Sequence, residues 1–234
     1  MKMSSVFQCP STSLVLTILT LGGLLGLYGY EFFQPTIQID DAYISYRYAQ
    51  NLVDGHGLVY NIGERVEGYT NLLWTLMVAG GIALGVSASL VGHWLGFASG
   101  VFLLLVTYFY SRSLLPQEMK WLALAAPMLL YASNSFVCWT ISGLETPLFA
   151  AWVTAAVAAF AIRRMGWVLV FCILASLTRP EGALLAALLL GFDWLAQLIA
   201  QRPKRLTELL RLSLPCLAYA LFIAGLTAFR VVYY

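Results

Sequence analysis

The sequence has few charged residues and no cysteine pattern. Charged residues make up 10% of the 234 residues, and the formal net charge is +2. A soluble domain is about 25% charged, so this composition excludes an ordinary soluble protein, and the small net charge argues against a nucleic-acid partner. The four cysteines lie far apart, without the spacing of a metal site or a disulfide framework: Cys9, Cys138, Cys172 and Cys216. No internal repeat or soluble domain is visible, so residues 1–234 are expected to form a single polytopic membrane domain.

Hydrophobic residues are abundant instead. They make up 61% of the chain, and the mean hydropathy is +0.81. Several apolar runs approach the roughly 17–25 residues that a spanning helix needs; they cover residues 14–28, 93–110, 121–136, 147–162, 165–177, 183–200 and 212–229. The sequence therefore predicts an all-α integral membrane protein with about seven transmembrane helices. No small-x-small cleavage site follows the first run, so this run is expected to remain as an uncleaved helix.

The longest polar stretch, residues 32–70, contains two adjacent acids, Asp40 and Asp41. After them a helical pattern begins, with one face formed by Ala42, Ser45, Tyr46, Ala49, Leu52 and Val53 and the other by Tyr43, Arg47, Gln50 and Asp54. This segment is too short and too polar to span, so we expect an amphipathic helix along the membrane interface with its aromatic side in lipid. Asp40 or Asp41 is the expected N-cap and Gly55 the expected stop. Residues 58–68 are expected to be extended, with glycine turns.

The basic residues decide the predicted topology. If residues 71–90 crossed the membrane, every later basic loop would lie outside, against the positive-inside rule. If this segment is re-entrant or juxtamembrane, as Gly80, Gly81 and Gly85 permit, those loops are cytoplasmic. The cytoplasmic basic residues are then Lys2, Arg112, Lys120, Arg163, Arg164, Arg202, Lys204, Arg205 and Arg211. We adopt the second solution, which places the N-terminus in the cytoplasm and three polar segments on the outer face with the acidic loop: residues 142–147, 178–182 and 229–234.

Four motifs resemble those of a known superfamily. Residues 40–48 read Asp-Asp-Ala-Tyr-Ile-Ser-Tyr-Arg-Tyr, and residues 57–74 read Gly-Leu-Val-Tyr-Asn-Ile-Gly-Glu-Arg-Val-Glu-Gly-Tyr-Thr-Asn-Leu-Leu-Trp. Both resemble the first outer loop of GT-C glycosyltransferases. Residues 142–148 (Ser-Gly-Leu-Glu-Thr-Pro-Leu) and 178–182 (Thr-Arg-Pro-Glu-Gly) are similar to later motifs of that superfamily. The similarity runs in matching order from about residue 13 to the end, and bacterial arabinofuranosyl- and mannosyltransferase-like members resemble the chain most.

This resemblance implies a multi-pass enzyme of the cell (plasma or inner) membrane that uses a polyprenyl-phosphate-linked sugar. It implies transfer at the outer, periplasmic face to a glycan, glycolipid or protein acceptor, with an acidic residue of the first outer loop essential. Members of the superfamily are usually much longer. The chain is therefore expected to be the N-terminal catalytic module of a longer enzyme, or to be completed by a second chain.

The candidate catalytic residues are acids. Adjacent carboxylates disfavour each other's charged form, which suits Asp40 and Asp41 to a general base or to a metal-assisted site. If a divalent cation such as Mg²⁺ or Mn²⁺ takes part, these two residues are the expected ligands. A helix cap is the structural alternative, but a cap explains one acid rather than two. Glu145 is a candidate second acid, with compensation of the helix dipole as its alternative.

The candidate substrate-binding residues are Arg47, Arg65, Glu67, Arg179, Glu181 and Arg230. A guanidinium matches phosphate bidentately, so Arg179 is a candidate for the donor phosphate, with a plain ion pair to Glu181 as the alternative. Arg47 follows the acids by about two helical turns and either pairs with them or snorkels at the interface. Two rival functions remain open: a non-catalytic or truncated GT-C-like subunit, and a transporter or flippase for a lipid-linked sugar.

Overall fold

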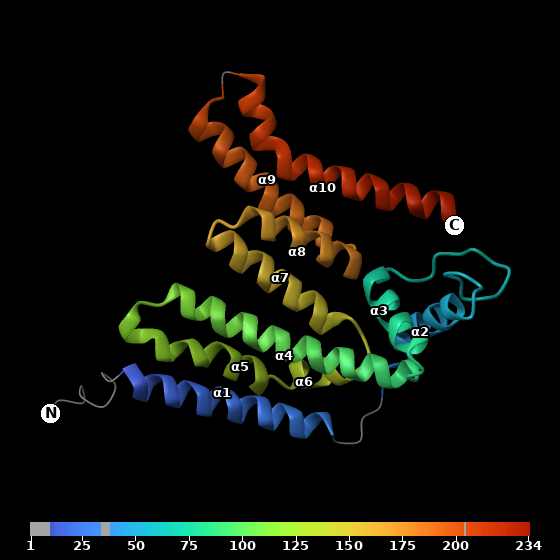
Figure 1. The fold of residues 1–234 in the computed structure, drawn as a ribbon, viewed down its shortest axis with the longest axis horizontal. Coiled ribbons are helices and arrows are strands. Elements are labelled where there is room, and N and C mark those ends of the chain that lie inside the picture. Colours follow the sequence, from blue (N-terminus) through green and yellow to red (C-terminus); the bar gives the residue numbers. More distant parts are fainter. Residues whose placement is uncertain (1–9, 34–37, 204) are drawn as a thin grey trace.

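The computed structural model describes residues 10–33, 38–203 and 205–234, and every regular element in this part of the chain is a helix. In chain order these elements are α1 (Pro10–Phe32), α2 (Asp40–Val53), α3 (Leu72–Ala83), α4 (Ala88–Leu114), the 3₁₀ helix η1 (Gln117–Leu124), α5 (Ala125–Ala132), α6 (Asn134–Ile141), α7 (Thr146–Ala161), α8 (Met165–Thr178), α9 (Gly182–Gln201) and α10 (Leu206–Tyr233). Figure 1 shows the long helices side by side along one axis, with α2 and α3 at one end of this bundle.

Three of the described helices are long and apolar enough to cross a membrane: α4, α9 and α10. They contain the predicted runs 93–110, 183–200 and 212–229. The runs 147–162 and 165–177 form α7, with 16 residues, and α8, with 14 residues. At 1.5 Å per residue these helices are about 24 and 21 Å long, less than the roughly 30 Å of a hydrocarbon core. The chain is thus an all-α protein with helices suited to a membrane.

The predicted run at 121–136 is not one straight helix. Here η1 and α5 (Gln117–Ala132) meet α6 at an angle of 65°, as a broken span or a re-entrant loop. Ser133 adopts an extended conformation between α5 and α6. Serine and asparagine side chains compete with helical hydrogen bonds, so the pair Ser133 and Asn134 is a natural place for the break.

The boundaries of α2 correct one prediction and confirm another. Ile39 is the N-cap, and Asp40 and Asp41 lie in the first helical turn, so neither acid caps the helix. In the first turn their negative charges compensate the helix dipole. At the other end, Gly55 has φ +84°, and the amides of Gly55 and His56 donate to the carbonyls of Leu52 and Asn51. This is a Schellman motif, so Gly55 ends the helix as predicted.

The small and aromatic face of α2 is buried in protein, not in lipid. Ala42 and Ala49 are fully buried, and Tyr46 is 4% exposed. They pack with Trp74 and Val78 of α3 and with apolar residues of α4 and α7. Four members of the predicted face are therefore confirmed as buried: Ala42, Ser45, Tyr46 and Ala49. Val53 is exposed instead, and Tyr48 and Asn51 are buried although they were not predicted. The predicted partner of the face was wrong, because α3 folds back onto α2 and covers it.

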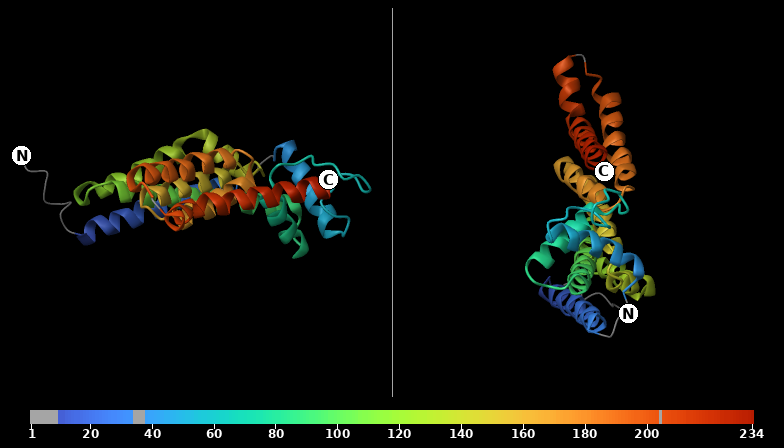
Figure 2. Two further views of the ribbon diagram at one scale, coloured as in Figure 1. Left: turned by 90° about the horizontal axis from the view of Figure 1, so that it is seen from above. Right: turned by 90° about the vertical axis from the view of Figure 1, so that its right-hand side faces the viewer.

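Helix α3 continues through Gly80 and Gly81 and ends in a second glycine turn. Gly85 has φ +86°, and Gly85 and Val86 donate to the carbonyls of Ile82 and Gly81. A Cβ at Gly81 would overlap Val91 of α4, so this glycine allows the two helices to approach. Figures 1 and 2 show α3 running across the bundle axis, with α4 beginning at the same end of the bundle.

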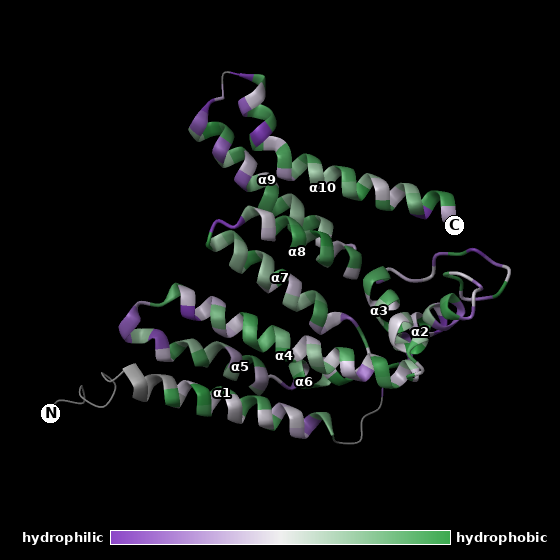
Figure 3. Cartoon of the chain, in the orientation of Figure 1, coloured by the Kyte–Doolittle hydropathy of each residue, from purple (hydrophilic) through white to green (hydrophobic). Residues whose placement is uncertain are grey.

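Polar residues gather at the two ends of the bundle. Figure 3 shows hydrophilic residues in the loop between α2 and α3 at one end, and in the α4–η1, α7–α8 and α9–α10 connections at the other. The second end carries the basic residues Arg112, Lys120, Arg163, Arg164, Arg202 and Arg205. We refer to it as the basic end and to the end with α2 and α3 as the acidic end.

Replacement of Gly96 by alanine is expected to destabilise the fold. A Cβ at Gly96 in α4 would overlap the carbonyl oxygen of Thr140 in α6, and this backbone atom cannot rotate away. Overpacking of this kind costs about 1–3 kcal/mol. Gly80→Ala is the matched control, because a Cβ at Gly80 meets no atom within 4 Å. Unfolding free energies from detergent titration of the purified protein test the difference, and equal values for the two variants would contradict the packing described here.

Candidate functional site

The start of α2 lies against the turn between α6 and α7. The amide of Ile39 donates to the carbonyl of Ser142 at 3.1 Å, and the hydroxyl of Tyr46 donates to the carbonyl of Gly143 at 3.3 Å. Gly143 has φ +83°, and a Cβ there would overlap the Tyr46 hydroxyl. These contacts bring the acids of α2 beside Glu145, although about a hundred residues separate them in sequence.

A buried network centres on Asn71, immediately before α3. Its amide nitrogen donates to Glu145 Oε2 at 2.8 Å and to Ser45 Oγ at 2.9 Å. Its amide oxygen accepts from Ser45 at 3.1 Å and from Thr75 at 3.2 Å. Asn71, Ser45 and Thr75 are all buried. One amide therefore connects α2, α3 and the start of α7.

Arg179 joins this network from the end of α8. Its Nη1 lies 3.4 Å from Glu145 Oε1, and its Nη2 lies 3.2 Å from Glu181 Oε1. The predicted pair with Glu181 is thus present, and Glu145 is a second partner. The backbone amide of Glu181 and the guanidinium of Arg179 together hold the pKa of the Glu181 carboxyl below its ordinary value. Both oxygens of Glu145 are occupied, one by Asn71 and one by Arg179.

These residues surround a pocket of about 340 Å³ at the acidic end. Its lining includes three of the predicted site residues, Asp41, Glu145 and Arg179. The remaining lining residues come from α2, from the segment before α3, from α6 and from the α6–α7 turn: Ile44, Ser45, Gly68, Tyr69, Thr70, Asn71, Trp139, Leu144 and Thr146. Asp40 is not among them, so the structure distinguishes two acids that the sequence left equivalent.

The other predicted substrate-binding residues lie elsewhere at the acidic end. Arg47 does not pair with the acids; its Nε donates to the carbonyl of Tyr60 at 3.2 Å. Glu67 and Arg230 form an ion pair at 2.9 Å, and the guanidinium of Arg65 lies 4.9 Å from the ring centre of Tyr233. The contacts of Glu67 with Arg230 and of Arg65 with Tyr233 attach the end of α10 to the loop between α2 and α3.

The tyrosines of α10 strengthen this attachment. The hydroxyl of Tyr233 accepts from the amide of Leu58 at 2.7 Å, and the hydroxyl of Tyr234 donates to the carbonyl of Leu58 at 3.1 Å. Tyr234 also lies 3.2 Å from the hydroxyl of Tyr69, which lines the pocket. Burial raises the pKa of the Tyr69 phenol, so this residue stays a neutral hydrogen-bonding group.

The donor set for a metal ion is small. Among the described residues, no group of three or more His, Cys, Asp or Glu side chains is arranged to hold a metal. Asp40 and Asp41 supply carboxylate oxygens of the kind that Mg²⁺ and Mn²⁺ prefer, but among the described residues no third acidic side chain is arranged to complete a site with both of them.

Several residues of the site were not predicted from the sequence. Asn71, Ser45, Tyr69 and Trp139 line the pocket, and Asn71 makes the most connections. A polar residue at the start of an apolar run was the available signal for Asn71, because such a residue must find partners when the run is buried. Ser45 was assigned to the correct face of α2 but read only as part of its packing.

Replacing Asn71 with alanine is expected to destabilise the site. The change leaves the carboxylate of Glu145 without one donor and Ser45 and Thr75 without their amide partner, which costs about 1–3 kcal/mol. Asn61→Ala is the matched control, since Asn61 is exposed and its amide bonds only the neighbouring Glu64. A surface change of that kind is expected to stay within about 0.5 kcal/mol. Comparable unfolding free energies for both variants would show that the Asn71 network does not support the fold.

Comparison with family models, with curated proteins and with solved structures finds no match to this chain. The resemblance to GT-C glycosyltransferases therefore stays a prediction that rests on the motifs themselves.

Proposed function

We propose that this protein is a membrane glycosyltransferase that moves a sugar from a polyprenyl-phosphate donor to a cell-envelope acceptor. The observation that carries the proposal is the pocket shared by Asp41, Glu145 and Arg179. Three segments far apart in sequence bring a carboxylate, a buried acid and a guanidinium to one end of an apolar helical bundle. A base beside a phosphate-binding cation is what this reaction requires.

The proposed topology has about seven crossings, with the acidic end outside and the basic end in the cytoplasm. The position of α3 supports it, because α3 and the start of α4 lie at the same end as α2 (Figure 1). The chain would then return to its side of the membrane between residues 71 and 90 instead of crossing. The gathering of basic residues at the opposite end agrees with the positive-inside rule.

In the proposed reaction Asp41 is the general base. It takes the proton from an acceptor hydroxyl as that oxygen attacks the anomeric carbon of the donor sugar. The new bond joins the acceptor oxygen to the anomeric carbon. The bond between this carbon and the phosphate oxygen breaks, and polyprenyl phosphate departs with the electron pair. A phosphate is a good leaving group, so no strong general acid is needed.

Arg179 is proposed to bind the donor phosphate and to stabilise the charge that develops on it. A guanidinium has five N–H donors, and the ion pairs with Glu145 and Glu181 leave some of them free to face the pocket. Charge-assisted hydrogen bonds of this kind are about twice as strong as neutral ones. Such bonds strengthen as the bond to phosphate breaks, and this difference lowers the barrier.

Glu145 is assigned a positioning role in this proposal. Because both of its oxygens are engaged by Asn71 and Arg179, it is poorly placed to accept a proton from the acceptor. It instead fixes the guanidinium relative to α2. Trp139 and Tyr69 supply flat rings in the pocket lining, which a sugar ring is able to cover.

The transporter alternative expects ionisable residues at helix centres. Asp193 is an acid inside the apolar helix α9, and it was not identified from the sequence. It is buried and pairs at 2.9 Å with Arg163 of the α7–α8 connection, while Gln197 donates to its second oxygen. Both of its oxygens are engaged by protein side chains, so a structural role accounts for it.

Loss of Asp41 is expected to abolish sugar transfer. Asp41→Asn removes the base, and general bases contribute about 10²–10⁴-fold. Transfer of labelled sugar from polyprenyl-phospho-arabinofuranose and polyprenyl-phospho-mannose in membranes measures the effect. Asp40→Asn is expected to lower the rate far less, because Asp40 does not line the pocket. Asp54→Asn, an exposed change at the C-cap of α2, is the control. Wild-type activity in Asp41→Asn, or a larger loss in Asp40→Asn, would overturn the assignment.

The orientation is tested by labelling single cysteines in a background without the native four. Ile62, in the loop between α2 and α3, is 61% exposed, and a membrane-impermeant maleimide is expected to label Ile62→Cys in intact cells. Arg202→Cys at the basic end is expected to react only after the membrane is opened. Labelling of Arg202→Cys but not Ile62→Cys in intact cells would show that the orientation is inverted. Labelling of both positions in intact cells would exclude the proposed topology.

A further inference from the structure

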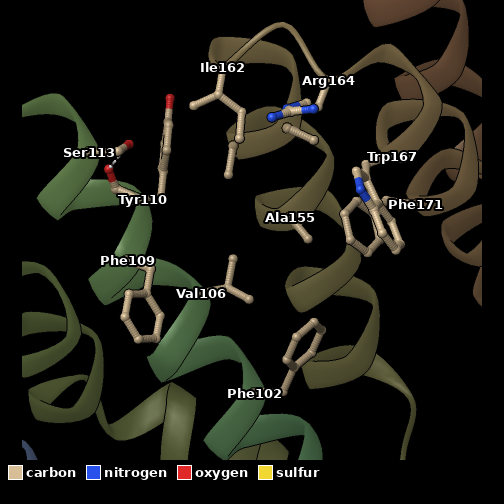
Figure 4. Close-up of a pocket in the computed structure, with 12 residues that line it drawn as sticks. Phe102, Val106, Phe109, Tyr110, Ser113, Ala155, Ile162, Arg164, Trp167 and Phe171 are labelled. Atoms are coloured by element: carbon tan, nitrogen blue, oxygen red, sulfur yellow. Dashed lines mark hydrogen bonds between the residues drawn. The ribbon is translucent and has the colours of Figure 1, made fainter.

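We infer that a groove at the basic end binds a phospholipid with an anionic phosphate headgroup. The groove has a volume of about 380 Å³ and lies between α4, α7 and the start of α8. It is on the opposite end of the bundle from the proposed active site and shares no residue with it. Figure 4 shows its aromatic and aliphatic walls, with Arg164 above one end.

The apolar part of the groove fits one hydrocarbon chain. Along α4 the whole groove, polar end included, extends from Phe102 to Ser113, which is about 16 Å at 1.5 Å per residue. A hydrocarbon core is about 30 Å thick, so the groove is about as long as one leaflet. The side walls are small or aromatic: Ala155, Ala158 and Ala159 of α7 leave space, and Trp167 and Phe171 of α8 stack at 5.7 Å between ring centres.

The polar end of the groove has the groups that a phosphate headgroup needs. Arg164, Tyr110 and Ser113 lie at this end. A second hollow of about 460 Å³ adjoins it, because both share Arg164 and Trp167, and the second hollow also contains Arg163. Trp167 is 58% exposed, as expected of an indole at the boundary between hydrocarbon and headgroups. The groove therefore suits the hydrocarbon tail of a lipid, and the second hollow suits its headgroup.

The two neighbouring arginines differ in a way that selects for an anion. Arg163 is already paired with the buried Asp193. Arg164, within the described residues, has a guanidinium without an ion pair or hydrogen bond and borders both hollows. A free cation at the mouth of an apolar groove complements a phosphate attached to a hydrocarbon chain. In the proposed topology this lipid belongs to the cytoplasmic leaflet.

Native mass spectrometry of the purified chain tests this inference, with dioleoyl phosphatidylglycerol and dioleoyl phosphatidylcholine as the probes. The two lipids have the same tails, so a difference in retention reports on the headgroup. We expect the wild type to retain phosphatidylglycerol preferentially. Arg164→Gln is expected to weaken this retention about tenfold, equal to about 1.4 kcal/mol. Arg211→Gln, which removes an exposed cation from α10, is the matched control and is expected to retain the lipid as the wild type does.

The tail part of the groove is tested separately. Ala158→Phe fills the groove and is expected to lower retention of both lipids, whereas Val157→Phe adds the same ring outside the lining. Ala158→Leu is a milder second variant if the phenylalanine disturbs folding. Equal retention of the two lipids by the wild type would overturn the inference, as would equal losses in Arg164→Gln and Arg211→Gln. A dimer that Ala158→Phe dissociates, without retained lipid, would show that a second copy fills the groove. None of these measurements depends on sugar transfer, so their failure is distinct from failure of the proposed activity.

Discussion

The buried carboxylate of Glu145 imposes the strongest constraint on this structure. A buried ion costs several kcal/mol unless it is paired and hydrogen-bonded, and here the partners come from distant segments. Asn71 contacts one oxygen from the start of α3, and Arg179 contacts the other from the end of α8. Asn71 and Arg179 must both reach the carboxylate of Glu145 for its two oxygens to have partners. The positions of α2 and α3 at the acidic end therefore depend on this one carboxylate.

In the proposed reaction the same constraint separates the roles of the acids. A carboxylate with both oxygens engaged is held in place and is a poor proton acceptor, whereas Asp41 lies in the first turn of α2 and borders the pocket. The pocket thus combines a fixed anion, the cation it positions and a second carboxylate facing open space. Division of labour between acids in different environments is a common basis for acid–base chemistry.

The features predicted correctly from the sequence are those that depend on residues close together in the chain. Part of the buried face of α2 (Ala42, Ser45, Tyr46 and Ala49), the end of this helix at Gly55 and the helical nature of the apolar runs follow from residue spacing and glycine conformation. The lipid-facing orientation of α2 was wrong because α3 covers that face, and no property of residues 42–53 reveals it. The break at Ser133 and the N-cap at Ile39 were not predicted, because each position depends on which of several possible local hydrogen bonds forms. Glu145 and Ser45 are distant partners of Asn71, and Arg163 is a distant partner of Asp193. The local sequence around Asn71 and Asp193 therefore shows that each polar group needs a partner but does not identify it.

Helix α7 connects the two ends of the molecule. Its N-cap is Glu145, whose negative charge lies at its positive N-terminus, and it ends beside Arg163 and Arg164, whose positive charges lie at its negative C-terminus. Ala151 and Ala156 are fully buried and pack against residues of the neighbouring helices. Close packing resists continuous deformation, so these contacts fix the position of the middle of α7. The pocket at one end and the groove at the other are therefore built on one rigid helix, and a change that shifts α7 would alter both together.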